Sequence, residues 1–308
     1  MAGKMMYIQG SMMMLAFLGY ILRKRGVIEE TGIRILSRLV TKFILPVNIF
    51  CTCMLSFSQE RIFDMGVMIL MGILVEIVLY AATRRMPFGR MSSDRKKIAR
   101  YSLAISNGGL IGIPVIEGLY GSEGVMLANM FLIATRALLP VLGVRIFAPA
   151  SGKEFKLKQI FCNAGVLAVI AGVGLSILRL PLPDFVLNAC SQISVCLSPV
   201  VLLLIGSMLY GNLGLKDGTE KKNIFELCIL KQMWIPLLLL AVLRLVPVAP
   251  ECKGIAVILM GMPLASATAM YAGEYGGDYT FAAKSAALST VSSFLTLIFL
   301  AKITEILF

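Results

Sequence analysis

Ten long apolar segments, separated by short polar connections, make up almost the whole chain. A helix that crosses a bilayer needs about 20 mostly apolar residues, and these segments are close to that length. They cover residues 5–22, 33–55, 63–83, 98–119, 124–147, 160–178, 185–210, 225–245, 254–275 and 280–306. Lipid offers the backbone no hydrogen bonds, and the alternating pattern of barrel strands is absent. The sequence therefore predicts an all-α membrane protein with ten transmembrane helices.

The composition fits lipid better than water as the solvent. Hydrophobic residues make up 58% of the chain and charged residues only 15%, whereas about 25% of a soluble domain is charged. The absence of histidine removes most metal sites and most acid–base catalysis at neutral pH. We therefore expect no catalytic residue, metal or cofactor. An intramembrane enzyme is disfavoured further because no His-Glu-x-x-His or Gly-x-Ser-x-Gly motif is present, and a membrane sensor would need a soluble output domain.

The net charge of +12 comes from short basic runs between the apolar segments, not from one basic face. These runs follow the first, third, fifth and seventh segments, as at residues 23–25 and 95–97. Basic residues gather on the cytoplasmic loops of membrane proteins. We therefore expect a multi-pass protein of the cell membrane with both termini outside the cytoplasm, and no nucleic-acid partner. The turn after the ninth segment has no basic residue and supports this orientation least.

The longest polar connection divides the segments into two sets of five. We predict a first five-helix repeat at residues 1–148, a cytoplasmic linker at 149–159 and a second repeat at 160–308. Because each repeat has an odd number of helices, the second repeat must lie inverted relative to the first. Paired inverted repeats are common in secondary transporters.

Internal similarity supports this duplication. The paired features occur in the same order in each half: Pro46 with Pro199, Pro114 with Pro263, and the Tyr-Gly turn at 120–123 with that at 275–278. Proline and glycine are common in membrane helices, so the order of the matches is more informative than any one match.

The fourth and ninth segments are predicted to be broken at their prolines, Pro114 and Pro263. Proline removes a backbone donor and collides with the preceding turn, and the glycines before Pro114 weaken the helix further. Unwinding inside a membrane is tolerated only where the freed groups face protein or a polar cavity. Two such breaks at matching positions predict a substrate site, with half-helix N-termini that favour an anion. The alternative is two kinked helices that pack normally.

We predict that the substrate-binding residues lie on and around these breaks. The candidates are Asn107, Gly108, Gly112, Pro114, Pro263, Ser266, Thr268, Asn48, Asn129 and Arg136. The guanidinium of Arg136 can pair with a substrate carboxylate, or it can form an ion pair with Glu76 or Glu117. The neutral polar residues can bind substrate, or they can join helices through hydrogen bonds worth about 0.6 kcal/mol each.

Further ionisable residues lie within the apolar segments. Glu76 is a candidate proton carrier, and the alternative is pairing between helices. Lys42, Lys231 and Lys284 lie nearer the predicted helix ends. Their ammonium groups can reach the membrane surface from there, or they can serve the site.

Three motifs together resemble the auxin efflux carrier family, in its prokaryotic malate permease-like branch. They are the run from Asn107 to Pro114, the run from Met262 to Asp278, and the stretch 288–293 in the last segment. The resemblance extends over essentially the whole chain. It implies ten helices in two inverted repeats, with the fourth and ninth crossing at the substrate site and Asn107 as its asparagine. It also implies organic anion substrates, a homodimer and an elevator-like motion. The long hydrophilic loop of the plant carriers is missing, so auxin itself is not implied.

These patterns predict a secondary transporter that moves a small organic anion, a carboxylate, by elevator-type alternating access in the lipid bilayer. A sodium-coupled organic anion symporter of related fold is the alternative, because unwound carbonyls and hydroxyls can also coordinate Na⁺. The direction of transport and its coupling are left open.

Overall fold

A computed structural model describes residues 2–55, 59–89, 91–147, 163–180, 182–215, 218–275 and 277–308. The predicted linker at 149–159 lies outside the described residues. Within them all regular structure is helical, apart from one isolated antiparallel bridge between Ser106 and Leu264. The prediction of an all-α chain is therefore confirmed.

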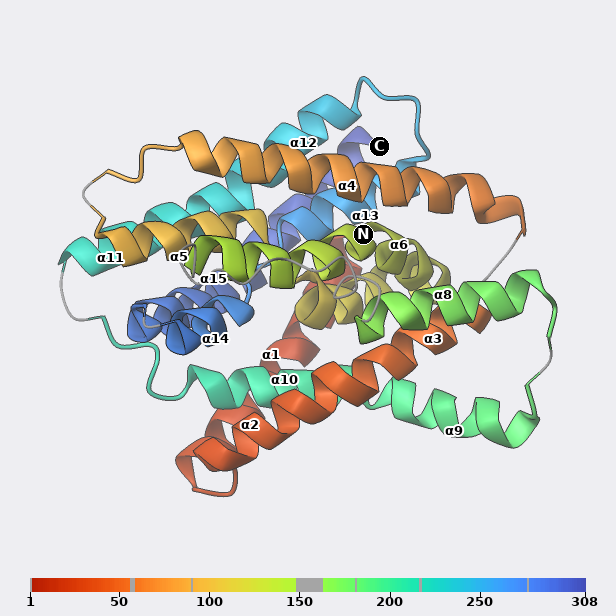
Figure 1. Cartoon of the computed structure of the whole chain (residues 1–308), viewed down its shortest axis with the longest axis horizontal. Coiled ribbons are helices and arrows are strands. Elements are labelled where there is room, and N and C mark those ends of the chain that lie inside the picture. Colours follow the sequence, from red (N-terminus) through yellow and green to blue (C-terminus); the bar gives the residue numbers. More distant parts are fainter. Residues whose placement is uncertain are drawn as a thin grey trace.

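The described N-terminal part of the chain contains eight α-helical or π-helical elements and one short 3-10 turn (Figure 1). They are α1 (Ala2–Lys24), α2 (Glu30–Leu39), the π turn η1 (Val40–Ile44), α3 (Leu45–Leu55), the 3-10 turn η2 (Gln59–Arg61), α4 (Ile62–Arg85), α5 (Ser93–Ala104) and the π turn η3 (Gly108–Gly112). Helix α6 (Ile113–Phe147) follows, and Gly121 interrupts it with a positive φ of 70°.

The C-terminal part continues the all-helical pattern. Its elements are α8 (Ala164–Ile177), α9 (Asp184–Val195), α10 (Leu197–Leu209), α11 (Gly218–Ile229), the π turn η4 (Leu230–Trp234), α12 (Ile235–Leu243), α13 (Pro250–Met260), α14 (Ala267–Glu274) and α15 (Tyr279–Leu307).

Seven helical stretches of the described part are long and apolar enough to cross a membrane. They are Gly3–Lys24, Glu30–Leu55, Ile62–Arg85, Gly108–Phe147, Asp184–Leu209, Gly218–Leu243 and Tyr279–Leu307. Helix α8 is apolar but shorter. The ninth predicted segment is divided between α13 and α14, and the fourth between α5 and the start of the long stretch that also contains the fifth. The difference from ten continuous helices therefore arises mainly where breaks were predicted.

Three of the prolines lie directly behind a widened turn instead of a break. The π turns η1, η3 and η4 are followed by Pro46, Pro114 and Pro236 at the second residue of the next helix. A proline ring collides with the carbonyl four residues earlier and cannot donate to it. A π turn moves that carbonyl away and lets the helix continue. This explains why Pro114 does not itself break its helix.

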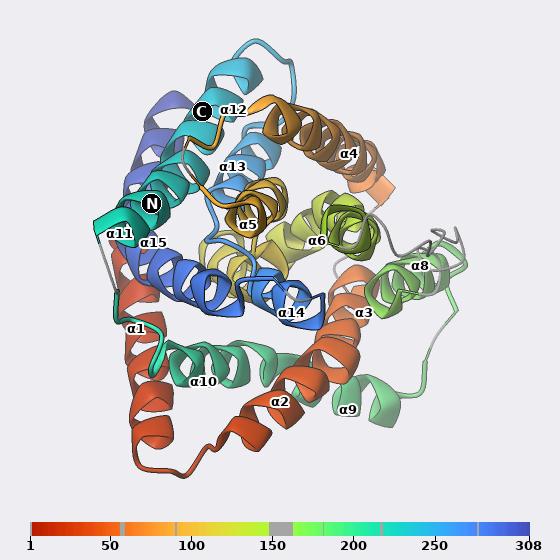
Figure 2. The ribbon, with the colours of Figure 1, turned by 60° about the vertical axis from the view of Figure 1, so that its left-hand side comes forward.

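The helices form two groups, which are separated most clearly in Figure 2. We call α1, α2, α3, α8, α9 and α10 the flanking group, and α4, α5, α6 and α11 to α15, with η3 and η4, the crossing group. Within the flanking group α1 packs on α10, and α3 packs on α8 and α9. Within the crossing group α4 packs on α6, and α14 packs on α15. Helices α1 and α3 also contact α6 across the boundary.

Glycines bring backbones into direct contact inside each group. A Cβ on Gly206 of α10 would lie 1.8 Å from the carbonyl oxygen of Ala16 in α1. A Cβ on Gly72 of α4 would lie 2.2 Å from that of Phe131 in α6. Small residues allow membrane helices to pack this closely. Both groups therefore contain helix pairs that tolerate no larger side chain at the contact.

Candidate substrate site

The first break lies between α5 and η3. Ile105 is extended, with φ −102° and ψ 126°, and Asn107 is also non-helical, with φ −81° and ψ 35°. The helix resumes at Gly108. The fourth predicted helix is therefore interrupted as expected, but the expectation that Pro114 marks the break is wrong. The break precedes the glycine run, and the π turn accommodates the proline.

The second break separates α13 from α14, and Pro263 lies within it. The two breaks meet. The backbone N–H of Asn107 donates to the carbonyl of Pro263 at 2.9 Å, and Ser106 forms the antiparallel bridge with Leu264. Part of the backbone freed in one helix thus pairs with the other, as buried backbone groups require. The described residues therefore bring the two interruptions into direct contact, and we call this meeting point the crossing.

Two buried hydroxyls at this crossing have no hydrogen-bond partner among the described residues. Ser106 is 3% exposed and Thr268 is 1% exposed, and the Oγ of Ser106 and Oγ1 of Thr268 are both unpaired. Leaving a buried polar group unpaired costs about 1–3 kcal/mol, and most such groups in proteins are paired. Asn107 is also buried, and its side chain does not cap the turn that follows. The crossing therefore offers polar groups to a bound molecule.

Four helix ends point toward the crossing. Helices α5 and α13 end there, while η3 and α14 begin there. A helix start has backbone N–H groups without intrahelical partners and a partial positive charge. The two starts therefore favour an anion between them.

A buried lysine occupies the end of α5. Lys231 in η4 is fully buried, and its Nζ donates to the carbonyl of Leu103 at 2.9 Å. It also lies within electrostatic range of the buried carboxylate of Glu76. The expectation that Lys231 reaches the membrane surface is therefore wrong. The ammonium group instead finds a helix end with partial negative charge inside the bundle.

Lys284 behaves similarly. Its Nζ lies 3.3 Å from a carboxylate oxygen of Glu220, and both side chains are almost fully buried. The expectation that Lys284 reaches the membrane surface is thus also wrong, because α11 provides an acidic partner inside. Lys42 in η1, by contrast, is exposed, as expected.

The second break is held by α15 and η4. The N–H of Leu264 donates to the Oγ of Ser289 at 3.1 Å. The side-chain amide of Gln232 donates to the carbonyl of Ser289, and Ser292 donates to Gln232 at 2.7 Å. Ser106, Gln232 and Ser289 are not among the site residues predicted from the sequence. The signal for Gln232 was a polar residue beside a lysine in an apolar helix, and Ser289 lies in the stretch 288–293 that contributes to the family resemblance.

Three predicted site residues form a second cluster on α3 and α6. The guanidinium of Arg136 donates to the backbone carbonyl of Asn129 at 3.0 Å and to its Oδ1 at 2.6 Å. The amide of Asn129 donates to the hydroxyl of Thr52 at 3.0 Å, and Thr52 donates to the carbonyl of Asn48 at 2.8 Å. The amide of Asn48 donates in turn to Ser194 of α9 at 2.8 Å. This chain of contacts crosses the boundary between the two groups.

Arg136 has neither of the two ionic partners considered for it. Thr135, its neighbour, donates to Glu76, and no carboxylate of the described residues forms an ion pair with Arg136. Its Nε is buried and has no hydrogen-bond partner among the residues that the structure describes. The prediction that Arg136 forms an ion pair with Glu76 or Glu117 is therefore wrong. No carboxylate among the described residues neutralises the guanidinium charge.

The two clusters lie side by side along α6. Leu132 lies between Asn129 and Arg136 on one helix face, at spacings of three and four residues. A Cβ on Gly108 would lie 2.9 Å from the Cδ2 of Leu132, and one on Gly112 would lie 2.8 Å from a methyl of Leu259. These two glycines thus admit close neighbours at the crossing. Their contact with substrate stays a prediction, as it does for Pro114, Pro263 and Ser266.

Ion pairs join the outer ends of the crossing group. Arg61 contacts Glu251 at 2.9 Å, Glu123 at 3.1 Å and Asp64 at 3.2 Å. Burial alone would lower the pKa of Arg61, but these carboxylates outweigh it and raise the pKa above its ordinary value.

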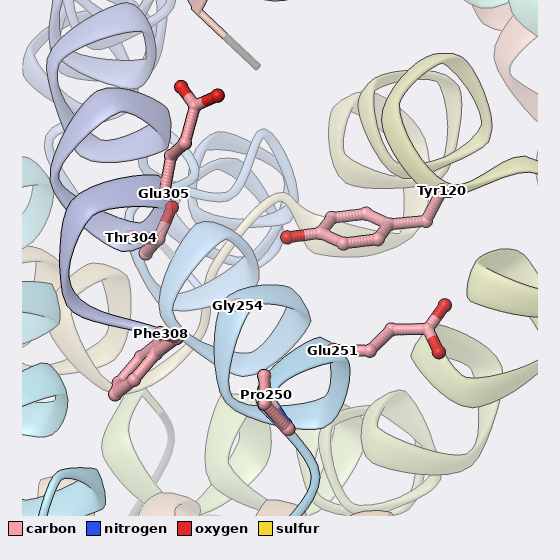
Figure 3. A pocket seen from close by; sticks show the side chains of 7 residues that line it. All are labelled: Tyr120, Pro250, Glu251, Gly254, Thr304, Glu305 and Phe308. Atoms are coloured by element: carbon pink, nitrogen blue, oxygen red, sulfur yellow. The ribbon is translucent and has the colours of Figure 1, made fainter.

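A cavity of about 280 Å³ lies beside Glu251, and Figure 3 shows the Tyr120 hydroxyl directed into it toward α13.

The other end of the crossing is tied as well. Arg95 at the start of α5 lies 3.1 Å from Asp278, which also caps α15 by accepting from the N–H of Phe281. Arg61 and Arg95 thus each connect one interrupted helix to the other.

Interrupted helices that meet inside a helical membrane protein are typical of secondary transporters. Comparison with known proteins identifies the family. The sequence model of a family described as membrane transport protein matches the chain twice, over residues 11–160 and 153–301. The chain therefore belongs to this family, which is auxin efflux carrier-like, and the resemblance noted from its motifs is confirmed.

A curated relative agrees with this assignment. An uncharacterized transporter from Methanothermobacter thermautotrophicus is 26% identical over 175 residues, which are 56% of this chain and 57% of the relative. The match thus spans little more than half the length of that protein. The family and this relative together indicate a transport protein and not an enzyme.

Proposed function

We propose that the protein is a secondary transporter that binds a small organic anion, a carboxylate, at the crossing of the two interrupted helices. The observation that carries this proposal concerns two buried hydroxyls that have no hydrogen-bond partner among the described residues. Ser106 precedes the start of η3, and Thr268 lies in the first turn of α14. A carboxylate oxygen accepts hydrogen bonds from such groups and from Asn107. The helix starts favour its negative charge.

The charge of Arg136 is a second argument for an acidic substrate. Its guanidinium is held by Asn129 and has no carboxylate partner among the described residues. An unpaired cation in a low-dielectric region is costly, and a substrate carboxylate would relieve that cost through charge-assisted hydrogen bonds. We propose that Arg136 approaches the substrate from the side of α6 that also contacts Gly108.

We further propose ten membrane-spanning helices in two inverted five-helix repeats, with the boundaries predicted from the sequence. Each half contains one interrupted helix, and a Tyr-Gly pair of the sequence follows each of them. In the first half Gly121 makes that turn with a positive φ, which glycine adopts readily. In the second half Asp278 ends it by capping α15.

The packing supports an elevator-type motion of the crossing group against the flanking group. The closest backbone contacts, at Gly19, Gly72, Gly172 and Gly206, all lie inside one group or the other. Across the boundary the contacts are made by side chains. They include Gly118 against Ile8 and the hydrogen bond from Lys4 to the carbonyl of Leu119 at 3.0 Å. Side chains can exchange partners during sliding, whereas interlocked backbones cannot.

The proposal is tested in proteoliposomes that contain the purified protein. Monocarboxylates, dicarboxylates and indole acids are screened for uptake, and Asn107→Ala is compared with Asn188→Ala, an exposed asparagine of α9. Loss of one hydrogen bond to a charged group corresponds to about a 10- to 100-fold loss of affinity. We expect that loss for Asn107→Ala only. Full transport by Asn107→Ala would remove Asn107 from the site, and transport of cations or sugars without any anion would overturn the substrate class.

The same vesicles separate this proposal from the sodium-coupled alternative. Carbonyls at a helix end can coordinate Na⁺, but the end of α5 already receives the ammonium group of Lys231. We therefore expect uptake to persist when Na⁺ is replaced by N-methylglucamine. Uptake that requires Na⁺ would favour the symporter.

Two further measurements test the proposed assembly and orientation. The mass of the detergent-solubilised protein tests the homodimer, and labelling of terminal tags from outside tests whether both termini face away from the cytoplasm.

A further inference from the structure

A strongly basic cavity of about 430 Å³ lies away from the crossing, where the end of α4, the start of α5 and the end of α6 meet. Five basic side chains line it together with neutral residues and without any carboxylate. The basic residues are Arg84, Lys96, Lys97, Arg100 and Arg145. This end of the helices is the one predicted to face the cytoplasm.

Most of this positive charge is uncompensated. Lys97 pairs with Asp94 at 3.0 Å. The four other basic residues make no ion pair with any described residue. The Nε of Arg100 is in addition buried and without a hydrogen-bond partner in the described part. Like charges that converge on one partly enclosed cavity repel each other, and an anion bound among them relieves that repulsion.

The cavity continues into an apolar surface on α4. Tyr80, Thr83 and Arg84 of this helix line the cavity. Closer to the middle of α4, a set of large apolar side chains is exposed: Leu70, Ile73, Leu74, Ile77 and Val78. In a membrane protein such a face lies against acyl chains. The helix therefore presents a cationic cavity and an apolar face one after the other.

We propose that this cavity binds the phosphate headgroup of an anionic phospholipid, whose acyl chains lie along the exposed face of α4. The chemistry that is recognised is a phosphate oxyanion. Guanidinium groups bind phosphate bidentately, and basic cavities between helices at the cytoplasmic side hold anionic headgroups. The apolar face of α4 favours a lipid over a free phosphate as the source. The site shares no residue with the crossing and does not depend on the substrate.

The test measures lipid binding to the full chain by native mass spectrometry in detergent. Phosphatidylglycerol and cardiolipin are compared with phosphatidylcholine. The variant Lys96→Gln/Arg100→Gln/Arg145→Gln is compared with Lys24→Gln/Arg25→Gln/Arg34→Gln, which removes three exposed charges from the region of α1 and α2. We expect the wild type and the control to prefer the anionic lipids by about tenfold or more, and the cavity variant to lose that preference.

Three results would overturn the proposal: equal retention of anionic and zwitterionic lipid by the wild type, an equal preference in both variants, or displacement of the bound lipid by millimolar inorganic phosphate. The last result would assign the cavity to a soluble oxyanion. If the triple variant does not fold, Lys96→Gln alone replaces it with a smaller expected loss. The wild-type preference must then also fall as salt is raised, because exposed charges are screened.

Discussion

The two breaks at the crossing are built differently. The first is short, carries the polar side chains of Ser106 and Asn107, and leads directly into a π turn. The second runs from Gly261 to Ser266, contains Pro263, and is held from outside by Ser289. The first break is thus anchored at the end of α5, by the side chain of Lys231. The second is anchored inside the break, where Ser289 accepts a hydrogen bond from the backbone of Leu264.

This difference indicates that the two breaks have different roles. In the first break the side chains are left available, because the backbone is satisfied by Pro263 and by the turn that follows. In the second break a neighbouring helix has to satisfy the backbone, because the proline prevents regular helix there. We infer that the first break selects the substrate and the second supplies a fixed partner for it.

The largest effect is expected for Lys231→Met, which removes the anchor of the first break. It leaves the carbonyl of Leu103 and the carboxylate of Glu76 without their cation. Removing one partner of a buried charge interaction destabilises by about 3–5 kcal/mol. The measurement is the free energy of unfolding in detergent. Lys42→Met is the matched control, because Lys42 lies in the π turn η1 but is exposed. Equal stability of the two variants would show that the first break needs no anchor.

A smaller loss is expected for Ser289→Ala, which removes the anchor of the second break. The N–H of Leu264 then lacks its acceptor, and an unpaired buried donor costs about 1–3 kcal/mol. Ser293→Ala is the control, because Ser293 is equally buried in α15 but donates only to its own helix, at Thr290. If both variants unfold at the same denaturant concentration, the contact from α15 does not hold the break.

The smallest change in the free energy of unfolding is expected for Ser106→Ala and Thr268→Val. The effect of these two variants on transport affinity tests the proposed site most specifically. Neither hydroxyl has a partner to lose in the described part, so the free energy of unfolding should stay the same or rise by about 1 kcal/mol. If both hydroxyls bind the substrate carboxylate, each variant should lose affinity by about 10- to 100-fold, as expected for one hydrogen bond to a charged group. Variants that are stable and transport with unchanged affinity would show that the unpaired groups serve another purpose.

The sequence predicted the features that lipid imposes locally. Long apolar segments must be helices, and glycines beside a proline predict where a helix is interrupted, so interruptions near Asn107 and Pro263 were expected. That the two interrupted helices meet was implied only by the family resemblance. The position of the first break relative to Pro114 was not, because a π turn can absorb a proline and no local pattern distinguishes the two outcomes.

The partners of the buried charges could not be predicted either. Lys231 and Lys284 find Leu103 and Glu220 only after distant helices pack. Spacing along one helix does not reveal which neighbour its face will meet. Arg136 shows the same limit, because Glu76 lies on a different helix and Glu117 lies beyond the interruption of α6 at Gly121. Its actual partner, Asn129, lies on the same helix.

The most direct test of the account is a cryo-EM map of the protein in nanodiscs with a saturating concentration of a carboxylate that it transports. We predict ligand density at the crossing, within hydrogen-bond distance of Asn107 and of the hydroxyls of Ser106 and Thr268. Ligand density elsewhere, with those two hydroxyls paired to the protein, would contradict the account, and so would two helices that run unbroken through the membrane.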